Sequence, residues 1–156
     1  MTGLKQNSIA AIIIAVFMKI VSCTPESCLE ETVVAKAKVP FYLSSTQKNT
    51  APDNLTIYGL DTVTDSIYAD SKNVSRAELP LDPSTDNCGF VVIINGVSDT
   101  IMVTYDSYPH LISIECGYTY YHTTGILSHT RNIIDTIIVR NTLVTTGNEE
   151  NFRILY

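Results

Sequence analysis

The chain has 156 residues and a formal net charge of −6. A nucleic-acid-binding role requires clustered Lys and Arg side chains, and this acidic balance argues against that class of partner. Because 45% of the residues are hydrophobic and only 17% are charged, the composition indicates a folded domain rather than a disordered chain.

The first 22 residues have the pattern of a secretion signal. Lys5 supplies the positive start, and residues 9–18 form an apolar run that is too short to cross a bilayer. The sequence Ile-Val-Ser at 20–22 precedes Cys23 and resembles the lipobox of a bacterial lipoprotein signal peptide. The alternatives are an ordinary secretory signal or a transmembrane anchor, and Lys19 counts against a transmembrane helix.

The lipoprotein interpretation makes Cys23 the mature N-terminus, with acyl chains on its sulfur and amine. Several chains on one residue give stable membrane anchoring. Thr24, rather than Asp, follows the cysteine, and by analogy with the sorting rule of enteric bacteria this favours the outer membrane. We therefore predict a signal helix over 1–22, a tether over 23–31 and one domain over 32–156, facing the periplasm or the cell surface.

Four cysteines are present, and lipidation of Cys23 leaves Cys28, Cys88 and Cys116 in an oxidising compartment. One disulfide and one odd thiol are the simplest outcome, with three possible pairings. We favour Cys28–Cys116, which ties the start of the mature chain to a tyrosine-rich strand and closes a long loop, stabilising the domain by a few kcal/mol. Cys88 precedes the apolar run 90–94 and can instead be a small buried side chain. The lack of a Cys-x-x-Cys pair and the scattered histidines argue against metal or redox chemistry, and no cofactor is expected.

The part of the chain after Cys23 has the composition of β-structure, because Val, Ile, Thr and Tyr alternate between clusters of turn residues. Pro40 marks an edge or a bend in the first strand. Residues 106–110 predict a loop, and Gly117 can interrupt the strand that follows. The predicted strands are residues 33–43, 55–59, 66–69, 77–81, 90–94, 100–105, 111–123, 132–141 and 152–156.

Two local patterns carry the fold prediction. Asn95-Gly96 suits a type I′ turn and predicts a hairpin between the strands on either side of it. The apolar residues of 132–141 point to both faces, which predicts a central strand. Many short strands without an amphipathic helix after the signal favour an all-β fold, an antiparallel β-sandwich of immunoglobulin-like or related topology. A closed barrel is the alternative.

Several short segments together resemble an uncharacterised family of small lipoproteins from Bacteroidetes. The resemblance supports the compartment and the extent of the domain, and implies no activity. Its pattern has no counterpart of Cys88, which implies that Cys88 is the unpaired thiol. The matching segments are Cys28, residues 57–59 (IYG), 79–83 (LPLDP), 99–101 (DTI), 103–105 (VTY), 108–110 (YPH), 115–117 (ECG), 131–135 (RNIID) and 149–154 (EENFRI).

A second resemblance concerns modification. Bacteroidetes attach glycans to Ser or Thr in Asp-Ser/Thr-apolar triplets, and four triplets of this form occur, centred on Thr62, Ser66, Thr100 and Thr136. A strand that opens after a turn also reads Asp-Thr-Ile, so exposure decides between the two interpretations. Thr62 and Ser66 lie in a turn-rich region and are the better candidates, whereas Thr136 is expected to be buried.

The segment 118–122 (YTYYH) is the main candidate for binding. Tyr118, Tyr120 and His122 share one face of a strand, and Tyr121 lies on the other. An exposed stripe of this kind can stack on sugars or a peptide. The competing interpretation places the rings in the sandwich core and its rim. The spacing of His110, His122 and His129 does not require a metal site.

No nucleophile motif and no glycine-rich phosphate loop occurs in the sequence. We therefore expect a non-enzymatic envelope protein, a structural or protein-interaction module that uses an exposed edge strand or face. The alternative is a glycan- or peptide-binding module that uses Tyr118, Tyr120 and His122, and a weak enzyme or hydrolase accessory ranks third. The expected partners are the membrane, through the acyl anchor, and another envelope protein or a glycan.

Overall fold

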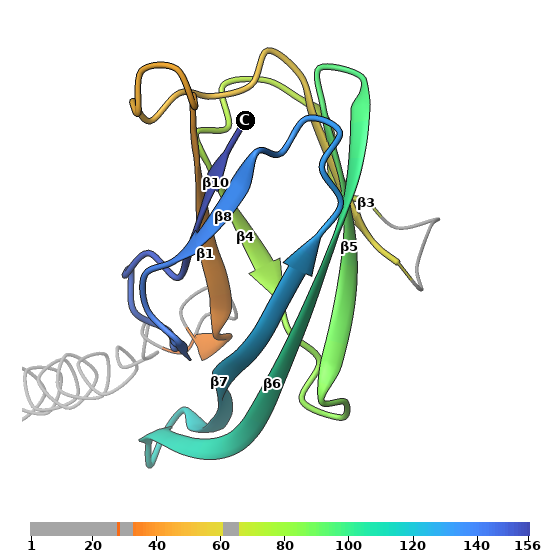
Figure 1. Ribbon diagram of the computed structural model, residues 1–156. Helices are drawn as coiled ribbons and strands as arrows, with labels where there is room; N and C mark the ends of the chain where they lie inside the picture. Colours follow the sequence, from red (N-terminus) through yellow and green to blue (C-terminus); the bar gives the residue numbers. More distant parts are fainter. Residues whose placement is uncertain (1–27, 29–32, 61–65) are drawn as a thin grey trace, which may run out of the picture.

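The computed structural model describes residue 28, residues 33–60 and residues 66–156 (Figure 1). The predicted signal segment, Cys23 and Thr62 lie outside these residues, as does most of the predicted tether. None of the described residues forms a helix that is long and apolar enough to span a membrane.

Two sheets form a β-sandwich, which confirms the predicted fold class rather than the closed barrel (Figure 1). The four-stranded sheet has the order β4-β1-β10-β8 and the six-stranded sheet the order β3-β2-β5-β6-β7-β9. The first contains β1 (Lys36–Tyr42), β4 (Arg76–Pro80), β8 (Thr136–Val139) and β10 (Phe152–Leu155). The second contains β2 (Leu55–Gly59), β3 (Ser66–Ser71), β5 (Asn87–Ile94), β6 (Val97–Ser113), β7 (Gly117–His129) and β9 (Leu143–Val144).

The core lies between the sheets and consists of the inward side chains of the central strands. Alternation along each strand sends every second side chain inward. Burial of these branched and aromatic groups supplies the main driving force for folding. The fully buried members include Val39, Phe41, Leu55, Ile57, Val92, Ile94 and Ile154.

The first and last strands of the domain lie side by side in the middle of the four-stranded sheet. β1 pairs with β10 in parallel, through Phe41↔Ile154 and Tyr42↔Leu155, while its other side pairs antiparallel with β4. Pro40 was predicted at an edge or a bend, but it lies in this interior strand. It is tolerated because the β10 ladder begins only at the next residue.

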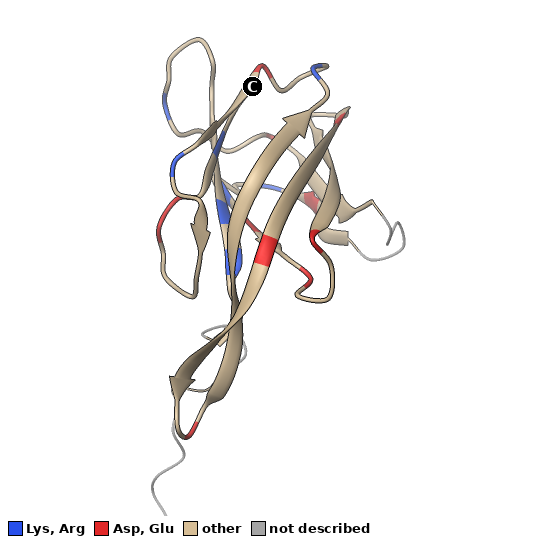
Figure 2. Cartoon of the chain, turned by 60° about the horizontal axis from the view of Figure 1, so that its bottom comes forward, with Lys and Arg blue, Asp and Glu red and all other residues tan. Residues whose placement is uncertain are grey.

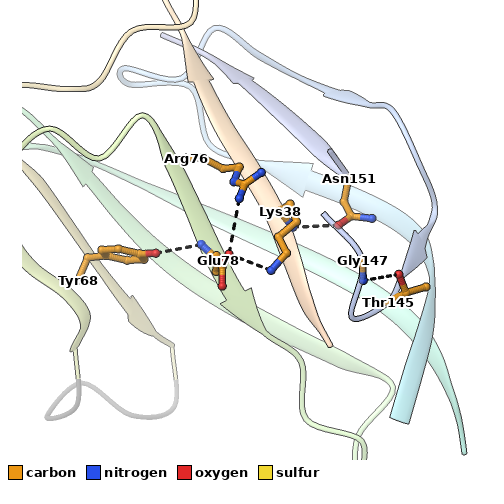
Figure 3. A network of polar contacts seen from close by, with 7 residues as sticks. All are labelled: Lys38, Tyr68, Arg76, Glu78, Thr145, Gly147 and Asn151. Carbon is orange, nitrogen blue, oxygen red and sulfur yellow. Dashed lines mark hydrogen bonds and ion pairs between the residues drawn. The ribbon is translucent and has the colours of Figure 1, made fainter. Parts of the chain in front are cut away.

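Asn151 replaces the missing part of that ladder. Its side-chain oxygen accepts the Lys38 N–H at 2.9 Å, and its own N–H donates to the Lys38 carbonyl, also at 2.9 Å (Figure 3). Its amide nitrogen donates to the carbonyls of Leu143 (2.7 Å) and Asn141 (3.2 Å). The side chain is 2% exposed, so a buried polar group keeps its hydrogen bonds and ties β1 to the segment around β9.

The outer face of the four-stranded sheet holds a partly buried ion pair. Lys38 Nζ lies 2.9 Å from Glu78 Oε1, on the neighbouring strand β4, and Arg76 lies 3.9 Å from the same oxygen (Figure 3). The hydrogen bond from Lys38 lowers the pKa of Glu78. At the free edge of β4, the Glu78 N–H donates to the Tyr68 hydroxyl of β3, which links the edges of the two sheets.

The Asn95-Gly96 hairpin is confirmed. β5 and β6 pair antiparallel from Ile94↔Val97 to Asn87↔Thr104. Asn95 has a φ of 51° and Gly96 a φ of 84°, the left-handed values that both central residues of a type I′ turn need.

The predicted loop at 106–110 is wrong, whereas the strand predicted over 111–123 is interrupted next to Gly117, the residue expected to break it. β6 continues through this loop to Ser113, the chain turns, and β7 starts at Gly117, whose φ is 73°. β5 accompanies β6 only as far as Thr104. Pro109 therefore lies where β6 has a partner strand on one side alone, a position at which proline is tolerated.

The predicted central strand 132–141 is also wrong. Only residues 136–139 are extended, and β8 is an edge strand of the four-stranded sheet. Ile138 and Val139 are 39% and 43% exposed. Residues 130–134 form a loop that binds the carboxylate of Asp99, and Ile134 alone of the alternating run is fully buried, while Ile133 and Ile137 pack against the core half-buried.

Candidate functional site

The most distinctive surface is the outer part of the β6–β7 hairpin, residues 108–121, which we call the hairpin tip. The two strands stay paired from Ile101↔His129 to Ser113↔Gly117. Since β6 pairs with β5 only as far as Thr104 and β9 pairs with only two residues of β7, the tip extends beyond the sandwich as a two-stranded ribbon (Figure 1). Ribbon side chains that have no second sheet to pack against remain exposed.

The tip is apolar and aromatic on both faces. Pro109↔Tyr120 and Leu111↔Tyr118 are cross-strand pairs on the face that continues from the core. Tyr118 is 74% exposed, Tyr120 47% and Leu111 47%, while Ile114 in the turn is 90% exposed. Exposed large hydrophobic groups gathered in this way indicate a contact surface.

A shallow groove lies behind the two tyrosines. It has a volume of about 230 Å³ and runs between the hairpin and the start of the domain. Its lining residues are Val34, Ala35, Leu81, Pro83, Tyr118, Thr119, Tyr120 and His122. The predicted stripe of Tyr118, Tyr120 and His122 is therefore brought together on one side of this groove.

His122 differs from the other two members of the stripe because it is 2% exposed. Its Nδ1 lies 2.8 Å from Ser107 Oγ, and its ring meets the Tyr105 ring edge-on at 5.4 Å. Burial lowers the pKa of this imidazole, so it is neutral at neutral pH. His122 therefore lies at the base of the groove, and only the two tyrosines of the stripe are exposed.

The opposite face of the tip is held together by ring contacts. His110 stacks on Tyr121 with ring centroids 4.0 Å apart, and Tyr108 meets Tyr121 edge-on at 6.2 Å. The Tyr121 hydroxyl lies 3.0 Å from Thr146 Oγ1, near the β9 edge. These contacts stiffen a ribbon that would be marginal by itself.

The histidines thus have separate structural surroundings. His129, the third, has its Nδ1 2.6 Å from the Thr130 carbonyl oxygen. Across the described ranges, no group of three or more His, Cys, Asp or Glu side chains has the geometry to hold a metal ion.

A disulfide ties the tip to the start of the domain. Cys28 and Cys116 are bonded, with Cα atoms 5.2 Å apart and a sequence separation of 88. This is the pairing that the sequence favoured among three. Of the cysteines that the structure describes, Cys88 is the free thiol; it is half-buried on β5, and burial raises its pKa to about 11. It therefore stays protonated at neutral pH, as expected of a packed side chain.

Asp99 is a buried acid that the sequence analysis did not single out. Its carboxylate is 1% exposed and accepts hydrogen bonds from the Thr130 hydroxyl at 2.5 Å and from the N–H groups of Asn132, Ile133 and Ile134 at 2.8–3.1 Å. Burial acts to raise the pKa of Asp99, but these donors outweigh it and lower the pKa to about 2. The sequence feature that could have identified it is an acidic residue at an inward-facing position of a strand with alternating apolar residues. All its partners belong to the chain, so we interpret it as structural.

The two predicted glycosylation residues differ in what the structure describes. Ser66 is the first residue of β3 and is exposed, opposite Tyr58 of β2. Thr62, like the lipidation candidate Cys23, falls outside the described residues.

Comparison with known proteins identifies a family match. A family model described as a family of unknown function (DUF6452) matches residues 54–156. The matched range begins after β1, although β1 is an interior strand of the four-stranded sheet. No curated protein and no solved structure matches the chain significantly.

Proposed function

The chain belongs to the DUF6452 family of unknown function, and we propose that it is a membrane-anchored lipoprotein of the cell envelope. In this proposal it is one of the small Bacteroidetes lipoproteins that its sequence resembles, attached to the outer membrane through acylated Cys23. It acts by contact, as a structural or protein-interaction module, rather than by catalysis.

The observation that carries the proposal is the hairpin tip. It presents Leu111, Ile114, Tyr118 and Tyr120 to the outside, an apolar surface on an acidic protein. Large apolar side chains that gather in one exposed place are typical of interaction sites. The disulfide at Cys116 fixes this surface close to the end of the chain that carries the predicted anchor.

The anchor is tested by intact-mass analysis of the membrane-extracted protein, beside the Cys23→Ala variant. We expect a mature mass that starts at Cys23 and includes added acyl chains, and loss of this form in the variant. Reduction adds the mass of two hydrogen atoms through the Cys28–Cys116 bond. A glycan on Ser66 or Thr62 adds further mass. An unacylated chain that keeps its first 22 residues contradicts the proposal.

A second candidate function is recognition of a glycan or peptide by Tyr118 and Tyr120. It is favoured by the position of the two rings over the groove of about 230 Å³. Aromatic rings that stand side by side on an exposed face can stack on a sugar ring or hold an apolar side chain. His122 contributes only as the support beneath them.

This candidate predicts that Tyr118→Ala and Tyr120→Ala each weaken binding to a ligand found on a glycan array or in a peptide library. The loss of one stacking ring should cost about tenfold in affinity. Tyr108→Ala is the matched control, because Tyr108 is 39% exposed on the opposite face. Equal losses in all three variants, or no ligand for the unaltered protein, would rule this function out.

A further inference from the structure

We propose that the hairpin tip rests on the lipid bilayer itself and inserts its apolar side chains into the interfacial region. The sandwich then stands end-on above the membrane. This inference rests on the proposed function, since it assumes an anchor at Cys23, and it names the partner of the contact surface described above.

The first argument is the covalent distance between the anchor and the tip. Four residues lie between Cys23 and Cys28, so the five Cα-to-Cα steps that join them span at most about 18 Å when extended. The disulfide holds the Cα atoms of Cys28 and Cys116 5.2 Å apart. An acyl group on Cys23 therefore keeps the turn of the hairpin within a short distance of the membrane surface.

The second argument is the distribution of apolar groups. Of the twelve exposed large hydrophobic side chains among the described residues, five belong to the fourteen residues of the tip: Tyr108, Leu111, Ile114, Tyr118 and Tyr120. They occupy both faces and the turn between them. A protein partner that binds a groove meets one face of a ribbon, whereas a bilayer surrounds an inserted tip. Tyrosines suit the interface because the ring enters the apolar region and the hydroxyl stays with water and headgroups.

The third argument is charge. The tip contains no Lys or Arg, and Glu115 is its single acidic residue (Figure 2). Contact with lipid is then apolar rather than electrostatic, and it needs no anionic headgroups. The Glu115 carboxylate, in the turn beside Ile114, stays in the headgroup region and limits the depth of insertion.

The end of β6 that lies opposite the tip provides a control position for the membrane contact. β6 runs from Val97 to Ser113, so the Asn95-Gly96 turn lies roughly 50 Å along the strand from the turn that ends the tip. An end-on domain brings one end of β6 to the membrane and keeps the other in water.

The chain contains no tryptophan, so one introduced indole reports on one place. We would purify the membrane-extracted protein as Ile114→Trp and as Val97→Trp, and bind each to phosphatidylcholine vesicles with and without doxyl-labelled lipid. Both positions are exposed, at 90% and 40%, and tolerate the larger ring. The expected result is a shift to shorter emission wavelength and loss of most of the intensity for Ile114→Trp, with no change for Val97→Trp. The result should be the same in high salt.

Two outcomes overturn the inference. If neither variant is quenched, the tip is free in water and available to a macromolecular partner. If both are quenched equally, the domain lies flat on the bilayer. The mass of each vesicle-bound chain is measured in parallel. An unacylated mass defeats the proposed function, whereas the quenching of the bound chain still decides the position of the tip.

Discussion

Replacing Asp99 with Asn should destabilise the domain by about 3 kcal/mol, a fall in melting temperature on the order of 10 °C. The carboxylate accepts hydrogen bonds from the Thr130 hydroxyl and from three successive N–H groups at 132–134. An amide of the same shape turns one acceptor into a donor that faces these donors. The loop 130–134 then loses the group that organises it, at a site that is 1% exposed.

The matched control is Asp106→Asn, because Asp106 lies on the same strand and is exposed. Urea unfolding of the two variants and the unaltered protein at neutral pH measures the effect. A loss for Asp99→Asn no larger than that for Asp106→Asn would contradict the structural role of Asp99.

The same carboxylate predicts how stability depends on pH. Its pKa is about 2 in the folded protein and 3.8 ordinarily, so the folded state binds the proton less tightly than the unfolded state. The stabilisation is therefore complete above about pH 4 and is lost as the pH falls toward 2. The difference in unfolding free energy between the unaltered protein and Asp99→Asn should shrink over this range.

Removing the disulfide with Cys116→Ser should cost about 4 kcal/mol of stability. The bond closes a loop with a sequence separation of 88 residues, and the chain-entropy model assigns a loop of this length roughly 4–5 kcal/mol. The hairpin tip also loses its fixed position beside the start of the domain. Thermal unfolding with and without reductant measures the effect, since reduction of the unaltered protein should reproduce the variant.

Cys88→Ala is the control, because Cys88 is a free, half-buried thiol that closes no loop. Its effect should be about 1 kcal/mol, the cost of a small cavity. Equal melting temperatures for Cys116→Ser and the unaltered protein would show that the disulfide does not constrain the fold.

Sequence patterns predicted the parts of this fold that depend on neighbouring residues. The Asn95-Gly96 hairpin is encoded by two residues that accept positive φ, and β2 has the predicted bounds because turn residues flank it. The pairing of Cys28 with Cys116 was favoured by loop length, and two other pairings were open until the structure placed Cys28 beside Cys116 of the tip.

The wrong predictions fall on segments whose structure is determined by residues far away in the sequence. The alternating run 132–141 fits a buried strand, but Asp99, more than thirty positions earlier, binds its first N–H groups and holds them in a loop. Proline at position 109 predicts a loop from the sequence alone. It fits a strand only because the pairing of β6 with β5 stops at Thr104, before Pro109 is reached.

The candidate site shows the same division. Strand alternation placed Tyr118, Tyr120 and His122 on one face, as the structure does. It does not say where the hairpin leaves the sandwich. That boundary falls between Tyr120 and His122, which leaves the first side chain exposed and buries the second.

The parallel pairing of β1 with β10 has a consequence for how the chain matures. In the four-stranded sheet, β10 lies between β1 and β8 and pairs with both. Neither β1 nor β8 can therefore pair with β10 until residue 155 has emerged. Contacts of such large sequence separation form slowly and late. A chain that emerges from the ribosome or a translocation channel in N-to-C order therefore cannot complete its sandwich early. Transport across a membrane in the unfolded state is compatible with this order of assembly.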